Sequence, residues 1–353
     1  MLMIRKSLSV IKAAITLSFA FLDHAFSMKK DQIVDVAFVE NNQIATEKPL
    51  IFYIHYSKRD TLTQNEIEVL SAIRESNFDI CLVMNSSQPR ERTASEILIN
   101  YSDFLSALIL RNNVGYDLGA YRDSFQNFTA RGIITDSTKV FIMNNSIFWF
   151  PKSVGPYLIK LSRMDADVIA SSISRQHTPH MQTFLFGSLT RDGNLALNQW
   201  LGTIKNWHFK RTIVSFGEMR SLRYLQRTIL VKSFPAESDL LTSMIEKLIA
   251  KEKKGHSRDI SKKTFTRLTT NQSFYNAGIP FNPSQSFWLE NIELGFPGIK
   301  IDFLKSNPSN VADYNLALSI CKKEGMDPEN LAQILLRNKT KSLYVKLRMR
   351  MKI

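Results

Sequence analysis

A run rich in glycine and carboxylate residues lies between an apolar stretch and a helical pattern in the first half of the chain. It spans residues 112–123 and contains Gly115, Asp117 and Gly119, with Asn113 at its start. Glycines let a backbone turn sharply and approach a ligand closely, while a carboxylate oxygen can serve a hard metal ion. The same residue types also form plain turns and helix caps. The run is therefore a candidate site that needs support from elsewhere in the chain.

A second candidate carboxylate, Glu218, precedes a helical pattern in the segment 215–220. Such a carboxylate can act as a general base that deprotonates a hydroxyl group. Ser215 and Glu218 also have the spacing of a capping box, and the start of a helix favours negative charge. The residues alone favour the cap.

Polar side chains also follow other apolar runs of the chain. These candidates are His55 and Tyr56, then Asn85, then Asn144, Asn145 and Ser146. A lone strand-end histidine is more typical of a satisfied partner than of a catalyst. The trio 144–146 offers amides and a hydroxyl, so either no metal binds there or Asp117 supplies the carboxylate; a polar turn is the alternative. His177, His180 and Gln182 lack obvious further zinc ligands, which favours a structural or substrate-contacting loop.

Alternating strand and helix patterns place these residues. Short apolar runs predict strands over 50–56, 80–84, 107–110, 140–143, 167–171 and 183–187. Helices are expected from Thr63, with Glu66 completing a capping box, and over 94–101 and 198–204. This order predicts an α/β fold with a mostly parallel sheet, in which ligands bind at the carboxyl ends of the strands. Neither a Gly-x-Gly-x-x-Gly nor a Walker-type motif opens a helix, which weakens dinucleotide and ATP hypotheses.

Composition limits the partners and the compartment. The 353 residues, 44% of them hydrophobic, can form one large or two modest domains, and the net charge of +14 suggests an anionic partner. Two distant cysteines, Cys81 and Cys321, argue against a disulfide framework or a cysteine-rich zinc site and favour a reducing cytosol.

Both termini combine apolar and basic residues. The stretch 8–22 is broken by Lys12, so it predicts an interfacial helix or one docked on the domain, with a signal peptide as the alternative and no membrane span. The basic tail after Glu329 suits either an anionic membrane surface or a solvated terminus.

Several motifs taken in order resemble the rhamnan synthesis protein F family of bacterial polysaccharide and lipopolysaccharide biosynthesis proteins. The matching segments are 53–56, 113–121, 143–146, 182–186, 217–218, 282–288 and 294–300. The resemblance implies a Rossmann-like GT-A glycosyltransferase that uses a nucleotide-sugar donor. It implies that Tyr56 and Asn85 face the nucleotide, that Asp117 lies at the donor and that Glu218 activates the acceptor. The chain departs from the family pattern at Asn145, where an aspartate is expected, and this bears on the use of Mg²⁺ or Mn²⁺.

We therefore expect an N-terminal segment 1–45, a GT-A-like domain 46–310 and a helical, basic tail 311–353. The predicted activity is transfer of a sugar, with rhamnose suggested by the resemblance, to a lipid-linked or polysaccharide acceptor. Glu218 and Asp117 are the predicted catalytic residues. The predicted donor-binding residues are His55, Tyr56, Asn85, Asn113, Gly115, Gly119, Asn144, Asn145 and Ser146. The expected location is the cytoplasmic face of the membrane. The alternatives are a non-catalytic glycan- or nucleotide-sugar-binding scaffold and, from charge alone, a nucleic-acid binder, for which no recognition motif is present.

Overall fold

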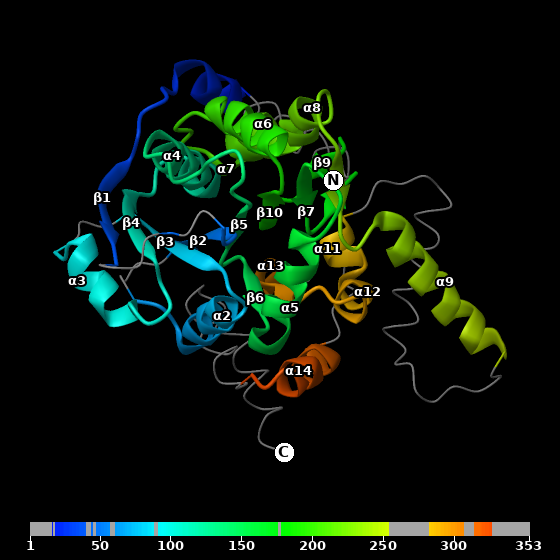
Figure 1. Cartoon of the computed structure of the whole chain (residues 1–353). Helices are drawn as coiled ribbons and strands as arrows, with labels where there is room; N and C mark the ends of the chain where they lie inside the picture. The colour runs from blue at the N-terminus through cyan, green and yellow to red at the C-terminus, as the bar shows by residue number, and fades with distance from the viewer. Residues whose placement is uncertain are drawn as a thin grey trace, which may run out of the picture.

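An eight-stranded mixed sheet forms the centre of the computed structural model, which describes residues 16, 18–39, 44, 47–56, 61–87, 91–175, 178–253, 282–306 and 314–326 (Figure 1). The strand order is β1-β4-β3-β2-β5-β10-β7-β11. The strands are β1 (Ile33–Phe38), β2 (Leu50–Tyr56), β3 (Asp79–Ser86), β4 (Ala107–Asn112), β5 (Val140–Asn144), β7 (Val168–Ala170), β10 (Leu185–Ser188) and β11 (Val231–Ser233). β4, β3, β2 and β5 run parallel, while β1 and β10 are antiparallel to their neighbours. The predicted α/β fold with a mostly parallel sheet is confirmed.

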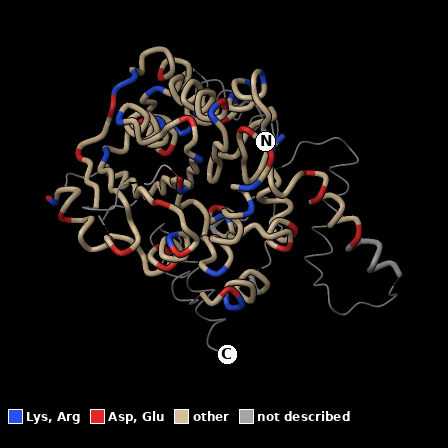
Figure 2. Tube along the Cα trace, viewed as in Figure 1, with Lys and Arg blue, Asp and Glu red and all other residues tan. Residues whose placement is uncertain are grey.

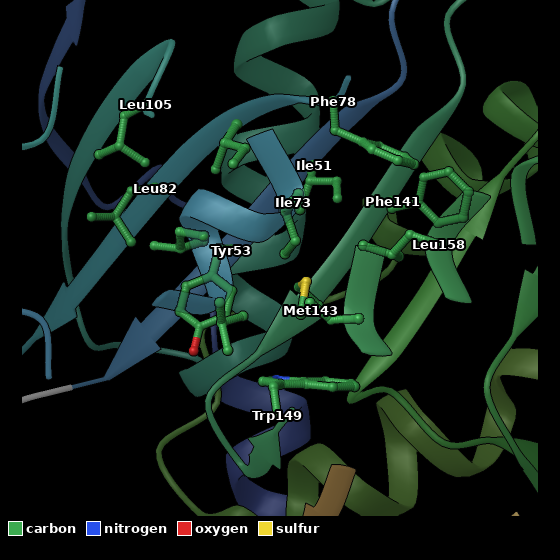
Figure 3. Packing of buried hydrophobic residues seen from close by; sticks show 14 of the residues in the cluster. Ile51, Tyr53, Ile73, Phe78, Leu82, Leu105, Phe141, Met143, Trp149 and Leu158 are labelled. Atoms are coloured by element: carbon green, nitrogen blue, oxygen red, sulfur yellow. The ribbon is translucent and has the colours of Figure 1, made fainter. Parts of the chain in front are cut away.

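Side chains of the central strands feed two apolar cores, one on each face of the sheet. In β2, Ile51 and Tyr53 belong to one core and Phe52 and Ile54 to the other, as strand alternation requires. Strands buried on both faces read as continuous apolar runs, which is why β2 and β3 lack a polar alternation. Figure 3 shows the first core, where Tyr53 and Ile51 gather with Met143 and Trp149.

Helices cover both faces of the sheet. The first core packs against α2 (Gln64–Glu75), α3 (Ala94–Leu98) and α5 (Pro151–Ser162); the second packs against α4 (Tyr116–Ala130) and α6 (Arg191–Gly202). The predicted capping box of α2 is confirmed, since the Thr63 side chain accepts from the Glu66 amide and Glu66 accepts from the Thr63 amide. A cap of this kind stabilises a helix by about 1 kcal/mol.

The remaining elements lie outside the central sheet. They are η1 (Ile99–Tyr101), β6 (Ile147–Trp149), β8 (Ile173–Ser174), β9 (His180–Met181), α7 (Lys210–Thr212), the π-helical turn η2 (Ile213–Gly217), the 3₁₀ turn η3 (Glu218–Arg220) and α8 (Ser221–Leu225). They continue with α9 (Glu237–Lys253), α11 (Pro283–Ser286), α12 (Trp288–Glu293), β12 (Gly298–Lys300), α13 (Ile301–Ser306) and α14 (Tyr314–Lys323). β12 pairs with β6, which brings the C-terminal part of the chain to the end of β5.

Two elements bear on the expected division of the chain. β1 lies within the segment expected outside the domain, yet it pairs with β4 in the central sheet. α14 lies beyond the expected boundary and contributes Ala317 and Cys321 to an apolar cluster with Phe148 and Phe150. The basic tail after Glu329 lies outside the described residues.

Two further expectations concern the cysteines and the membrane. Cys81 and Cys321 are free thiols and both are buried. Within the described parts of the chain, no helix is both long and apolar enough to cross a bilayer.

Candidate active site

The glycine-rich run forms the turn from β4 into α4, as predicted. Gly115 has φ +77° and Tyr116 has φ +52°, so the chain passes through the left-handed region just before the helix begins. A Cβ on Gly119 would lie 2.7 Å from the Val114 carbonyl oxygen. Both glycines are thus explained by the fold of the turn. Their contact with a donor stays a prediction.

A buried ion network holds this turn in place. Arg111, at the end of β4, donates from Nε and Nη2 to Asp123 at 3.1 and 2.9 Å. Its Nη2 also donates to the Val114 carbonyl at 2.6 Å. Arg122 donates from Nε to the other carboxylate oxygen of Asp123 at 2.7 Å. The three charged side chains are almost fully buried, so Asp123, which the sequence placed at the turn, is a structural residue.

Asn85 and Asn113 belong to the same network. Asn85 accepts from Arg111 Nη1 at 2.7 Å and donates to Asn113 Oδ1 at 2.6 Å. The end of β3 is therefore tied to the turn after β4, as expected from parallel strands whose carboxyl ends share an edge. The structure brings Asn85 and Asn113, both predicted to bind the sugar donor, to this edge. Some of their hydrogen bonds are used to hold the turn between β4 and α4.

Asp117 lies in the first turn of α4 and faces the end of β5. Asn144 donates from Nδ2 to Asp117 Oδ2 at 3.0 Å and to the Tyr121 hydroxyl at 2.7 Å. The Tyr121 hydroxyl donates to the Thr183 carbonyl at 2.7 Å. Asn144 Oδ1 accepts from the amide and hydroxyl of Ser146. We call Asp117, Tyr121, Asn144, Thr183 and Glu218 the Asp117 cluster.

The environment of Asp117 perturbs its ionisation. Burial raises the pKa of the Asp117 carboxyl to about 6, with Glu218 adding to the rise, while Lys210, Arg111 and the Asn144 hydrogen bond oppose it. A carboxylate that exchanges its proton near neutral pH at the edge of a sheet is a common feature of functional sites.

Glu218 approaches the cluster from an irregular helical segment. The five-residue π-helical turn η2 ends at Gly217 and passes directly into the 3₁₀ turn that Glu218 begins. The amide and hydroxyl of Thr183 point toward Glu218 Oε1 at 3.4 and 3.3 Å. The Ser215 capping box favoured by the residues alone does not form, because no side-chain cap opens η3 and Ser215 lies within the π-helical turn. Single π turns are frequent at functional sites.

Two lysines that the sequence did not single out accompany these carboxylates. Lys300 ends β12, and the amide of the next residue, Ile301, donates to the Ser146 carbonyl at 2.9 Å. The Lys300 ammonium lies 5.6 Å from the centre of the Phe184 ring. Burial lowers the pKa of Lys300, and the charge of Glu218 raises it. Lys210 acts electrostatically on both Asp117 and Lys300.

The end of β2 holds a separate buried pair. His55 Nδ1 lies 2.7 Å from Glu66 Oε1, and the pKa of Glu66, which burial raises, is brought down to about 2 by His55 and Thr63. Asn145 extends its amide nitrogen to His55 Nδ1 and Glu66 Oε1, at 3.3 Å each, and to the Tyr56 carbonyl at 3.2 Å. Tyr56 itself is exposed. Glu66 thus satisfies His55 Nδ1, while the buried Nε2 of His55 has no partner among the described residues, and the contact of His55 with a donor stays a prediction.

Asn145 therefore has a structural reason to differ from aspartate. Its amide donates toward a carboxylate, so a second carboxylate at this position would face Glu66 with like charge. Asn145 also points toward the β2 end, whereas Asn144 is the residue that meets Asp117.

The donor set around Asp117 does not fit Mg²⁺ or Mn²⁺. Among the described residues, no group of three or more His, Cys, Asp or Glu side chains could hold a metal ion. Asn144 presents its amide nitrogen to Asp117, and Lys210 and Lys300 bring positive charge where a divalent cation would need oxygen ligands. His180 is buried with its Nδ1 2.7 Å from the Thr178 carbonyl, and His177 lies outside the described residues.

A small cavity lies beside Lys300. Its volume is about 10 Å³, room for one water-sized group, and it is lined by Ser172, Phe184, Trp288 and Lys300 among others. The Ser172 hydroxyl and the Trp288 indole N–H are buried without a partner in the described structure. The cavity is lined mostly by apolar surface and lies between Lys300 and α12.

Comparisons with known proteins give weak likenesses. No family model matches the chain, so the resemblance to the rhamnan synthesis family stays a prediction. Virulence protein VirA of Vibrio anguillarum is 23% identical over 296 residues, covering 81% of this chain and 88% of that protein.

Two solved structures are similar in outline. The glycosyltransferase GlyE of Streptococcus pneumoniae TIGR4 matches 53% of this chain and 45% of its own, with 14% identity and a TM-score of 0.31. The mannosyltransferase PcManGT of Pyrobaculum calidifontis, solved with GDP-Man and Mn²⁺, matches 97% of this chain and 92% of its own, with 14% identity and a TM-score of 0.32. Likenesses at this level carry no argument about the activity of this chain.

Proposed function

We propose that this chain is a glycosyltransferase that uses a nucleotide-sugar donor and binds it at the Asp117 cluster. The observation that carries the proposal is the electrostatic influence of Glu218 and Lys210 on Asp117, and of Glu218 on Lys300, at the carboxyl edge of a mostly parallel sheet. Ligands of open α/β sheets bind at this edge. Carboxylates suit sugar hydroxyls, and lysines suit the diphosphate of such a donor.

The proposed reaction uses the chain's own side chains. Glu218 accepts the proton of an acceptor hydroxyl, whose oxygen attacks the anomeric carbon of the donor sugar. The bond from that carbon to the diphosphate breaks, and its electron pair leaves with the nucleoside diphosphate. Lys300 and Lys210 stabilise the charge that develops there, which is the contribution a metal ion would otherwise make. Asp117 orients the donor by accepting from its hydroxyl groups.

We further propose that the sugar is rhamnose and that the acceptor is a polysaccharide or lipopolysaccharide precursor. Only the family resemblance supports these two assignments. The non-catalytic scaffold remains the competing function, because the aspartate expected at Asn145 is absent. It predicts nucleotide-sugar binding without turnover.

A donor panel tests the proposal. Release of nucleoside diphosphate and sugar transfer would be followed with Asp117→Asn and Glu218→Gln, against the matched exposed controls Asp192→Asn and Glu75→Gln. Asp192 occupies the first turn of α6, as Asp117 does in α4, so this control keeps the helix position. Both site variants should lose about 100-fold or more of the activity, and the controls should keep it. Unchanged activity in both site variants would remove the site assignment.

A further inference from the structure

The N-terminal helix (18–26) packs on the domain through its small and polar residues. Ala20, Asp23 and Ser27, spaced along one face, are buried. The Asp23 carboxylate accepts from the His208 and Phe209 amides at 3.1 Å and from the Ser27 hydroxyl at 2.9 Å. Aromatic contacts add to these polar ones, because the His24 ring stacks on the Phe216 ring with centres 4.0 Å apart and Phe21 meets the same ring edge-on at 5.3 Å. Residues 18–26 thus form a helix docked on the domain, which is one of the alternatives expected for the stretch 8–22.

The opposite face of this helix is apolar and exposed. Phe19, Leu22 and Phe26 follow helical spacing and are 55%, 52% and 79% exposed. Phe21 and Met28 are also exposed, and Phe209, from the loop before α7, meets Phe19 with ring centres 6.3 Å apart. We call these six residues the apolar face. In an ordinary surface helix the large apolar side chains face the core, whereas those of the apolar face are exposed to solvent. Large exposed apolar patches mark interaction sites.

Basic residues border the apolar face. Lys29 and Lys30 follow Met28, and Lys210 and Arg211 follow Phe209; all four are exposed. Asp31 is an exposed acidic neighbour, whose carboxylate accepts from the Ile33 amide at 2.8 Å. Figure 2 shows basic residues where the N-terminal helix leads into β1, on the same side of the molecule as α6 and α8 in Figure 1. An apolar centre with a basic border is the pattern of helices that lie on anionic lipid surfaces.

We propose that the apolar face docks on the surface of an anionic membrane, with its aromatic side chains among the acyl chains and with Lys29, Lys30 and Arg211 at the headgroups. A second copy of the chain fits this face less well, because a symmetric contact would oppose the two basic borders. The proposal stands independently of the enzymatic one.

Co-sedimentation of the full chain with vesicles tests the proposal. Vesicles of phosphatidylcholine alone and with phosphatidylglycerol would be compared, at low and high salt. The wild type should bind the anionic vesicles more tightly and lose binding as salt rises. The variant Phe19→Ser/Leu22→Ser/Phe26→Ser should bind at least about tenfold more weakly. The variant Lys29→Gln/Lys30→Gln keeps the apolar face. It should bind anionic vesicles about fivefold or more weakly than the wild type does, and its binding to phosphatidylcholine vesicles should be unchanged.

Matched controls separate docking from loss of folding. Ile99→Ser removes an exposed apolar residue from η1, at 74% exposure, and should bind as the wild type does. Each variant's far-ultraviolet circular dichroism and melting temperature would be compared with those of the wild type. The proposal is overturned if the wild type ignores anionic vesicles, or if the triple variant binds as tightly as the wild type. It is also overturned if the wild type is a dimer that the triple variant dissociates.

Discussion

Replacing Asp117 by asparagine should stabilise the protein while it removes activity. The pKa of this carboxyl is raised from 3.8 to about 6 by its surroundings. At about 1.36 kcal/mol per pKa unit, ionised Asp117 costs at most about 3 kcal/mol, and we expect about 1–3 kcal/mol because the side chain is partly exposed and screened. Asparagine keeps an acceptor for Asn144 and removes the charge.

The pH dependence gives the sign of this effect. The folded state holds the proton of Asp117 more tightly than the unfolded chain does, so ionisation favours unfolding. The cost is absent below the unfolded pKa of 3.8, grows between that value and about 6, and is fully present above it. Asp117→Asn should therefore exceed the wild type in stability at pH 7.5, and the difference should vanish near pH 4.

Urea unfolding at the two pH values measures the difference. Asp192→Asn is the control, because Asp192 is an exposed first-turn residue whose loss should cost only a few tenths of a kcal/mol through the helix dipole. A variant that gains stability and loses turnover has the trade-off expected of a functional residue. If Asp117→Asn were no more stable than the wild type at pH 7.5, or kept its advantage at pH 4, the electrostatic reasoning would be refuted.

Three further predictions follow from the same contacts. Asn145→Asp should lower the free energy of unfolding by about 1–3 kcal/mol, because it replaces a hydrogen-bond donor to buried Glu66 with a like charge. An unchanged urea midpoint at neutral pH would contradict this. Arg111→Ala should cost about 3–5 kcal/mol by leaving Asp123 buried without this partner, and a loss below about 1 kcal/mol in urea unfolding would exclude a structural role for the network. Lys300→Met should weaken nucleotide-sugar binding by about tenfold or more in calorimetric titration, and retained affinity would exclude the diphosphate role. The melting temperature should not fall, because the substitution removes a partly buried charge.

Local patterns in the sequence predicted much of the sheet and one edge of the site. The apolar runs of β2, β3, β4 and β5 and the capping box of α2 are encoded by neighbouring residues, so they can be identified without the fold. The polar strand ends at Asn85, Asn144 and the Asp117 turn were predicted to share an edge because parallel strands require it, and the structure brings them together.

The remaining parts of the site depend on contacts between distant segments. Lys300 reaches the cluster through the pairing of β12 with β6, and no local pattern predicts that pairing. Arg111 ends an apolar run, so a search for charged residues at predicted strand ends could have found it. Its burial against Asp123 is visible only in the structure. Glu218 was ambiguous because its spacing from Ser215 suits a cap. The π-helical turn excludes that cap, and the role of Glu218 as a base stays a prediction.

A crystal structure of the chain with a nucleotide-sugar tests the central claim most directly. We expect the diphosphate beside Lys210 and Lys300, the sugar hydroxyls within hydrogen-bond distance of the Asp117 carboxylate, and Glu218 facing the space left for an acceptor. A nucleotide bound elsewhere on the chain, or bound here with its sugar turned away from Asp117, would contradict it.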